Sequence, residues 1–247
     1  MDNFIYVAAS GAREAMLAQS VNSNNLAHAS TTAFRGDLAM AQSRYLHGEG
    51  HSSRVYGNVS NSAVDFTRGV INTTGRELDI AVNGPGWMVV QSPADGSEAY
   101  SRRGDLHITE LGQLINGAGE QLMGDSGPIA LPPFSEIAIG SDGTVSIVGL
   151  GEDANALAAV ATIKLVNPDQ ADLVKGEDGL IRMREGEPAP VDDSVRVVSG
   201  SLESSNVNTV AAMVDMIELA RQFESYVKIM GTAEEMDRAS AELMSMS

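Results

Sequence analysis

The 247-residue sequence contains no cysteine, which excludes disulfide bonds and thiol catalysis. Aromatic residues are scarce as well, at 4%, with a single tryptophan. Because aromatic side chains bury the most area per residue, their shortage favours thin cores and helices that pack through Ala, Met, Val and Leu. Packing of this kind favours long interfaces over compact globules.

Basic residues are in the minority, since 16 lysines and arginines stand against 33 acidic residues, for a formal charge of −17. A charge of this sign repels nucleic acid and anionic lipid, so we expect the protein to bind neither directly. No stretch approaches the roughly 20 apolar residues that span a bilayer. The first residues lack a cationic region followed by an apolar run, so no cleaved signal peptide is expected.

What the chain does contain is helical periodicity at both ends, over residues 3–26 and 207–244. Stripes of this small and partly polar kind bury too little to stabilise a lone helix, so the two helices are predicted to pair as a coiled coil, with each other or with neighbours. Asn206 or Asn208 can cap the second helix. The predicted stripes are Ile5, Ala8, Ala12, Ala15, Gln19, Asn22 and Leu26, and Met213, Met216, Ala220, Phe223, Val227 and Met230.

The middle of the chain changes character near residue 77. Residues 31–76 are rich in Ser, Thr, Asn and Gly and show no sustained period, which indicates an extended connector. From Glu77 onward apolar residues alternate, as in Leu78, Ile80 and Val82, and the strands have no helices between them. Further strands are predicted at 87–90, 99–102, 105–109, 113–115, 137–139, 144–148, 161–166, 179–183 and 196–199.

The predicted fold class is therefore α+β. Long terminal helices, residues 1–30 and 204–247, form a coiled-coil domain. The extended connector follows at 31–76. A central antiparallel β-rich domain, either a sandwich or a barrel, covers 77–203.

No motif for catalysis or cofactor binding is present: the chain has no Walker loop, G-x-S-x-G elbow, HExxH or EF-hand pattern. Only His47 and His51 are spaced to share a metal, and the glycines between them and the lack of a third ligand favour a surface loop. The acid pairs at 192–193 and 234–235 point in different directions on a strand or a helix. We therefore expect no enzymatic activity, no metal and no cofactor.

Two alternatives of another class stay open at this stage. The tripeptide Arg-Gly-Asp occurs at 35–37 and 103–105, which would suit a secreted adhesin, although Gly and Asp are common in turns anyway. A wall-degrading enzyme is the other alternative, but no convergent carboxylate pair supports it.

Two segments near the termini carry the most specific pattern. Residues 24–35, Asn-Asn-Leu-Ala-His-Ala-Ser-Thr-Thr-Ala-Phe-Arg, resemble the ANNLANxxTxGF motif of bacterial flagellar rod and hook proteins. Residues 200–208 and the helix after them resemble the C-terminal signature of the same axial family. Segments 74–87, 99–104, 127–129 and 163–168 are similar to proximal-rod members of the family. Distal-rod members are the alternative, and residues 164–168 and 232–237 resemble the proximal-rod members more.

The first motif departs from the family at two positions, since His28 stands for an Asn and Ala33 for a Gly. If that Gly has positive φ, Ala would cost about 1 kcal/mol or more there. We therefore predict a negative φ at Ala33.

The resemblance implies a structural subunit of the proximal rod of the flagellar basal body. Family members are exported uncleaved through the flagellar type III apparatus and stack into a hollow helical shaft that crosses the periplasm. In such a shaft the terminal helices would line the channel and the β-rich domain would face outward. The implied partners are copies of the chain, neighbouring proximal-rod subunits, the distal-rod protein and the export apparatus, without nucleic acid or a membrane span.

The residues predicted to contact other subunits lie in the two motif segments and the last helix. Leu26 and Phe34 would be apolar anchors, with Asn24 and Asn25 as hydrogen-bonding partners. Some of these residues could instead act within their own chain. Leu26 and Phe34 could pack on the last helix, and Asn206 and Asn208 could cap it. The predicted interface comprises Asn24, Asn25, Leu26, Phe34, Asn206, Asn208, Met213, Met216, Arg221, Phe223 and Val227.

Overall fold

The computed structural model describes residues 2–45, 55–151, 156–176 and 178–245. Contacts within the chain divide it into two compact units. The helical unit comprises residues 1–29, 36–65 and 207–247, and the β-rich unit comprises residues 30–35 and 66–206.

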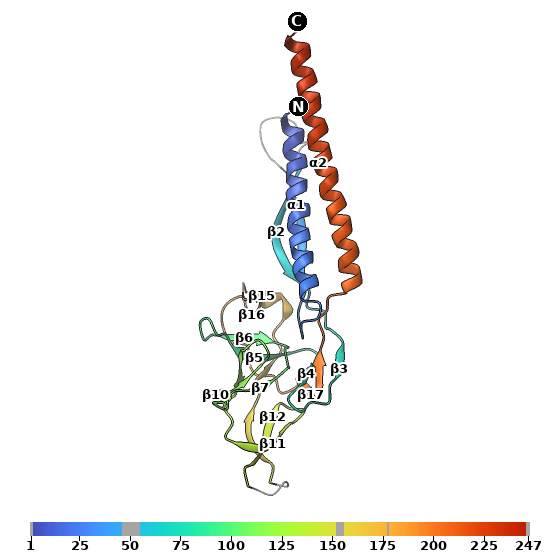
Figure 1. The fold of residues 1–247 in the computed structure, drawn as a ribbon. Coiled ribbons are helices and arrows are strands. Elements are labelled where there is room, and N and C mark those ends of the chain that lie inside the picture. Colours follow the sequence, from blue (N-terminus) through green and yellow to red (C-terminus); the bar gives the residue numbers. More distant parts are fainter. Residues whose placement is uncertain (1, 46–54, 152–155, 177, 246–247) are drawn as a thin grey trace. The chain divides into compact units, whose positions relative to one another are not determined.

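The helical unit contains two long helices, α1 (Asp2–Ala27) and α2 (Thr209–Ser245) (Figure 1). They run antiparallel, because the Asn22 side chain near the end of α1 donates a hydrogen bond of 2.7 Å to the carbonyl of Ala212 near the start of α2. Farther along, Gly11 faces the ring of Tyr226, and a Cβ at Gly11 would lie 2.6 Å from that ring. Glycine at this position therefore permits the close approach of the two helices.

The predicted coiled coil is wrong. The side chains that α1 buries are the small ones of Ala8, Ala12 and Ala15, whereas two predicted seam residues of α2, Met213 and Val227, are 54% and 45% exposed. In a coiled coil the seam residues of each helix insert into holes on the facing helix, and the exposed Met213 and Val227 do not. A β-hairpin also packs along α1, so its apolar face is divided between a helix and strands (Figure 1).

That hairpin also overturns the prediction of an extended connector. β1 (Asp37–Tyr45) pairs antiparallel with β2 (Val55–Val64), with a register shift between Met40 and Ala41. The segment shows no clear period two because strand formation depends on cross-strand and tertiary packing more than on intrinsic preference. The α+β part of the predicted fold class agrees with the structure.

The β-rich unit contains short strands in several sheets, so the prediction of one sandwich or barrel is also wrong. Its strands are β3 (Ile71–Thr73), β4 (Ile80–Asn83), β5 (Trp87–Gln91), β6 (Glu98–Ser101), β7 (His107–Ile108), β8 (Leu114–Ile115), β9 (Gln121–Gly124), β10 (Gly127–Pro128), β11 (Phe134–Ile139), β12 (Thr144–Gly149), β13 (Ala158–Thr162), β14 (Leu165–Val166), β15 (Leu173–Lys175), β16 (Ile181–Met183), β17 (Arg196–Ser199) and β18 (Ser201–Glu203).

The largest sheet has the order β15-β16-β6-β5-β9-β8-β7, with β10 paired to β9 and β14 to β5. Separate sheets have the orders β11-β12-β13, β17-β4 and β18-β3. A short 3₁₀ helix covers Gln170–Asp172.

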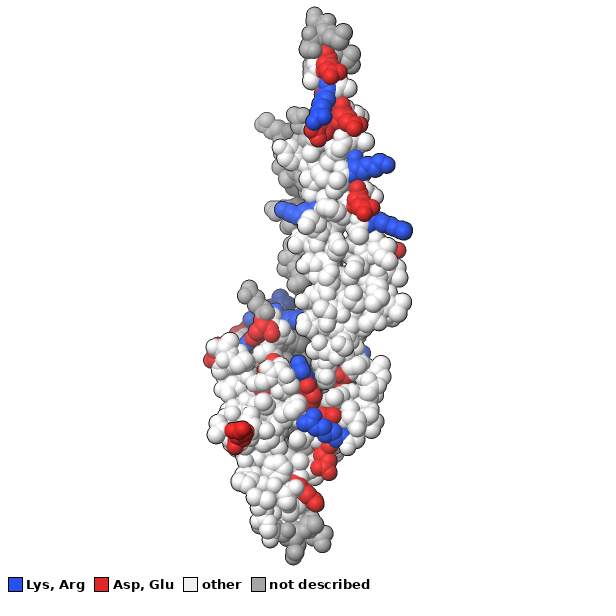
Figure 2. All heavy atoms as spheres, viewed as in Figure 1, with Lys and Arg blue, Asp and Glu red and all other residues white. Residues whose placement is uncertain are grey.

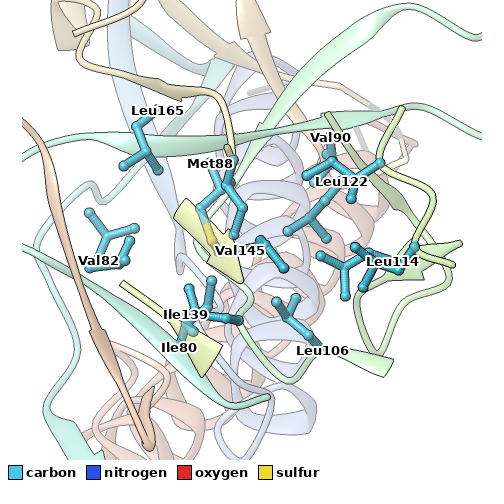
Figure 3. Packing of buried hydrophobic residues seen from close by; sticks show 14 of the residues in the cluster. Ile80, Val82, Met88, Val90, Leu106, Leu114, Leu122, Ile139, Val145 and Leu165 are labelled. Carbon is cyan, nitrogen blue, oxygen red and sulfur yellow. The ribbon is translucent and has the colours of Figure 1, made fainter. Parts of the chain in front are cut away.

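Strand β5 lies at the centre of this unit and is buried on both faces. Met88 and Val90 point into the larger core, which they share with Ile80 of β4 and Val145 of β12 (Figure 3). Trp87 and Val89 point to the other side, into a second cluster. Burial on both faces explains why the sequence of β5 is a continuous apolar run and not an alternating one.

Candidate assembly site

The first motif segment begins at the end of α1, where Asn25 fixes the start of β1. Its side-chain oxygen accepts a hydrogen bond of 2.8 Å from the amide of Asp37, and its side-chain nitrogen donates one of 2.7 Å to the carbonyl of Asp37. Asn25 thus has a role inside its own chain. Asn24 is exposed and Leu26 is half-buried.

The rest of this motif is a short segment, residues 30–35, that belongs to the β-rich unit. We call it the strap. The ring of Phe34 is half-buried, with the ammonium nitrogen of Lys175 4.6 Å from its centroid. The Phe34 carbonyl accepts a hydrogen bond of 3.3 Å from the amide of Asn206. Phe34 and Asn206, both predicted interface residues, are therefore in contact with each other.

The prediction of a negative φ at Ala33 is wrong, because its φ is +55°. The Ala33 amide donates a hydrogen bond of 2.8 Å to the carbonyl of Glu203. This contact with residues far along the chain holds Ala33 in a conformation that alanine disfavours. The usual glycine of the motif would adopt it with less strain.

Glu203, in the second motif segment, is the centre of a buried ion network. Its side chain is 1% exposed. One carboxylate oxygen, Oε1, accepts hydrogen bonds from Arg35 at 2.5 Å and from the amide of Gly69 at 2.9 Å. The other, Oε2, accepts a hydrogen bond of 2.7 Å from Nε of Arg102. The network thus joins the strap, the segment before β3, the end of β6 and β18.

Arg102 ties this network to the turn between β4 and β5. Its guanidinium donates hydrogen bonds to the carbonyls of Val82, Gly84 and Gly86 at 2.6–3.1 Å. Burial lowers the pKa of Arg102, and the adjacent Glu203 carboxylate opposes that shift. The guanidinium carbons of Arg35 and Arg102 each lie 5.7 Å from the ring centroid of Trp87.

The network was not predicted from the sequence, although Arg35, Arg102 and Glu203 each lie in a segment that carries the family resemblance. No local pattern indicates it, because charged residues are rarely buried unless paired and the partners of Glu203 lie 168 and 101 positions away in the chain.

The predicted interface residues of α2 fall on different sides of the helix. Met216 and Phe223 are half-buried, whereas Met213, Arg221 and Val227 are exposed. Asn208 is the N-cap, because its side-chain oxygen accepts hydrogen bonds from the amides of Val210 and Ala211 at 3.0 and 3.1 Å. Asn206 does not cap α2, and its side chain instead donates to the carbonyl of Thr67 at 3.1 Å.

A continuous apolar stripe covers the exposed side of the first turns of α2. Val210, Met213, Val214 and Ile217 follow the helical spacing of three and four and are 70%, 54%, 50% and 55% exposed. We call them the α2 stripe. Farther along, the same side carries Arg221, Glu224 and Lys228, all exposed. On the face shown in Figure 2, the start of α2 is accordingly almost free of charge, and charged side chains gather farther along the helix.

Neither Arg-Gly-Asp tripeptide presents free side chains of the kind an adhesin would use. In the first, Arg35 is 3% exposed. In the second, Nε of Arg103 donates a hydrogen bond of 2.8 Å to the Asp105 carboxylate.

His47 and His51 lie outside the described residues, and no group of three potential metal ligands occurs within the described ranges. Neither α1 nor α2, over its described residues, has the length and apolarity needed to cross a membrane.

Two family models match the segments that hold these features. Residues 81–147 match the flagellar hook protein FlgE/F/G D1 domain, which includes β5 and most of the larger core. Residues 198–243 match the flagellar basal body rod FlgEFG protein C-terminal domain, which includes Glu203, the Asn208 cap and the α2 stripe.

Comparison with curated proteins extends the match to the full length. The chain is 38% identical to the flagellar basal-body rod protein FlgF of Escherichia coli, over all of both chains. The chain belongs to the FlgF family of flagellar basal-body rod proteins. The FlgF proteins of Salmonella typhimurium and Caulobacter vibrioides are 38% and 32% identical, with coverage of 100% and 98% of each chain.

The alternative that the sequence left open, the distal-rod protein FlgG, is a more distant relative. FlgG of Bacillus subtilis is 27% identical over 94% of this chain. The proximal-rod resemblance is thus confirmed at the level of the FlgF family. As an FlgF-family chain, the protein is a structural subunit of the flagellar rod.

Proposed function

We propose that this chain is a subunit of the proximal rod and that it assembles through heterologous contacts, which extend into a helical tube instead of closing into a symmetric pair. The observation that carries the proposal is the α2 stripe. It exposes four neighbouring apolar side chains on a helix whose other side packs on α1. Contiguous apolar surface of this kind marks an interaction site.

The size of the stripe fits a subunit that assembles only within a stack. Full burial of an aliphatic side chain contributes about 1.5–3 kcal/mol, and these four are 50–70% exposed, so covering them yields about 3–7 kcal/mol. Association costs about 4–15 kcal/mol in lost translational and rotational freedom. The stripe alone therefore does not hold two free subunits together, and several simultaneous contacts in a growing rod are needed.

The predicted interface residues divide between two roles in this proposal. Met213, in the stripe, supplies burial. Arg221, with Glu224, lies beyond it and sets the register, since exposed ion pairs contribute only about 0–1 kcal/mol. Val227 and Asn24 are exposed as well and are available to a neighbouring subunit. Asn25, Leu26, Phe34, Asn206, Asn208, Met216 and Phe223 act mainly within the chain, where they shape or hold the elements that carry the surface.

The further parts of the proposal follow from membership of the rod family. The partners are copies of the chain, neighbouring proximal-rod subunits and the distal-rod protein. The subunit reaches the rod through the flagellar export apparatus without a cleaved signal peptide and lies where the rod crosses the periplasm. Its role is mechanical, with no catalysis and no cofactor.

A charge placed in the α2 stripe tests the proposal. Ile217→Asp is expressed in cells that lack their own copy of the protein, with Ala211→Asp as the control. Ala211 is exposed in the first turn of α2 but lies off the stripe, where an added carboxylate suits the helix N-terminus. We expect Ile217→Asp to abolish swimming and rod completion, and Ala211→Asp to preserve both. Normal swimming with intact rods in Ile217→Asp would refute this role of the stripe.

A further inference from the structure

Three residues attach the strap to the rest of the β-rich unit. The Ala33 amide donates to the carbonyl of Glu203, and the Phe34 carbonyl accepts from the amide of Asn206. The Arg35 side chain binds the carboxylate of Glu203, and the Arg35 carbonyl accepts a hydrogen bond of 3.1 Å from Lys175. These contacts range from 2.5 to 3.3 Å and the Arg35–Glu203 pair among them is buried, so the docked strap has a defined position.

The docked strap also carries unfavourable features. Ala33 has a φ of +55°, and it is the one non-glycine residue with positive φ in the described ranges. Within those ranges, Nε and Nη1 of Arg35 are buried without a hydrogen-bond partner. Positive φ strains alanine, and unpaired buried donors lose their hydration without compensation. Backbone strain of this kind persists only where surrounding contacts impose it.

The net charge of the network also disfavours the docked strap. Arg35 and Arg102 are 3% and 4% exposed, and both bind the single carboxylate of Glu203. Two guanidinium groups against one carboxylate leave the buried network with an excess positive charge. Removing such a charge from water is unfavourable unless it is fully paired.

Opening would relieve all of these features without leaving Glu203 unpaired. If the strap moved away, Arg35 would regain water and Ala33 could return to a negative φ. Oε1 of Glu203 would keep the amide of Gly69, and Oε2 would keep Arg102. The carboxylate therefore has a complete set of partners in the β-rich unit before the strap docks.

We propose that the strap is a releasable clasp, which undocks from the Glu203 network as one local opening while the β-rich unit stays folded. Residues 29 and 36 on either side of it belong to the helical unit. Release therefore frees a segment through which the chain passes from the helical unit to the β-rich unit and back. The device is a property of the single chain and does not depend on assembly into a rod.

Residue-resolved amide hydrogen exchange on the full chain under native conditions tests the proposal. The amides of Ala33 and Asn206 report strap docking. Ser204 and Leu106, whose amides donate to the carbonyls of Val70 and Leu78, report the body of the β-rich unit. We expect Ala33 and Asn206 to exchange at a common rate at least tenfold faster than Ser204 and Leu106, because a local opening has a lower free energy than global unfolding.

Two glycine substitutions sharpen this test. Ala33→Gly removes the strain without removing a contact, and we expect it to slow the exchange of the Ala33 position and Asn206 about fivefold, as about 1 kcal/mol of relieved strain implies. Ala118→Gly is the matched control, since Ala118 is exposed in a turn and does not have positive φ. It should leave both strap amides unchanged.

Three outcomes would overturn the clasp. The first is exchange of Ala33 and Asn206 as slow as that of Leu106. The second is Ala33→Gly leaving the strap amides unchanged or accelerating them. The third is Ala33→Gly slowing Leu106 and Ser204 by the same factor as Asn206, since the strap would then open only when the whole unit unfolds.

Discussion

Arg102 and Arg103 are adjacent in the sequence, and each pairs with a carboxylate, but only the pair of Arg102 is fully buried. This difference gives a prediction about stability. Arg102 is buried between Glu203 and three backbone carbonyls. Arg103 makes an ion pair with Asp105 in which the side chains are 27% and 19% exposed. Replacing each in turn by methionine keeps most of the aliphatic stem and removes only the charged fork.

The expected losses differ several-fold. Removing one partner of a buried ion pair costs about 3–5 kcal/mol. Glu203 keeps Arg35 and Gly69, but the carbonyls of Val82, Gly84 and Gly86 lose their guanidinium donor, so we expect Arg102→Met to lose about 4 kcal/mol. For Arg103→Met we expect a loss of about 1 kcal/mol or less, because its pair is partly solvated.

Urea unfolding followed by tryptophan fluorescence measures both losses. Trp87 is the single tryptophan of the chain and packs against the Arg102 guanidinium, so it reports on the network directly. With a denaturant slope of about 2 kcal/mol per molar, the unfolding midpoint should fall by about 2 M for Arg102→Met and by at most about 0.5 M for Arg103→Met. High salt should reduce the second loss and leave the first nearly unchanged. Equal unfolding midpoints for the two variants would refute the conclusion that the buried Arg102 guanidinium stabilises the fold more than the partly solvated Arg103.

Two further predictions concern single side chains. Asn208→Ala removes the side-chain oxygen that accepts hydrogen bonds from the amides of Val210 and Ala211, so α2 should lose about 1 kcal/mol of stability. Circular dichroism should then show a lower melting temperature of the helical signal, and an unchanged melting temperature would contradict the capping role. Burial raises the pKa of Glu120 from 4.5, and its hydrogen bond from Asn116 opposes this. Since the folded state then binds the proton more tightly, wild-type stability rises as pH falls through the raised pKa toward 4.5. Glu120→Gln should thus be more stable than the wild type at pH 7, with a difference that narrows toward pH 4.5; urea midpoints at both pH values test this, and a pH-independent difference would contradict it.

Prediction from the sequence succeeded where the signal was local. Both terminal helices, and strands such as β5, β12 and β17, appear where periodicity placed them. The same reasoning failed for the hairpin of β1 and β2, whose 37–64 segment has no clear period. There, pairing with a neighbouring strand and packing on α1 decide the conformation, and neither is encoded within a short window.

The inner face of α2 was predicted in part, and the error has a physical cause. The predicted stripe of α2 followed its large apolar residues. Met216 and Phe223 are half-buried as expected, whereas Met213 faces outward and the residue buried at that level is Ala212. Close helix packing selects small residues, whereas periodicity gives more weight to large ones, so the face was misplaced at Met213.

The sequence by itself determined the FlgF family, the helical termini, the β-rich middle and the lack of any catalytic motif, because each of these depends on residue types and short-range spacing. Only the tertiary structure decided the positive φ of Ala33, the outward face of α2 and the network around Glu203. Arg35 and Glu203 are 168 positions apart, and Arg102 and Glu203 are 101 apart. Contacts over such separations exist only after the chain has folded, and they determine which charges are buried and which apolar side chains stay exposed to solvent.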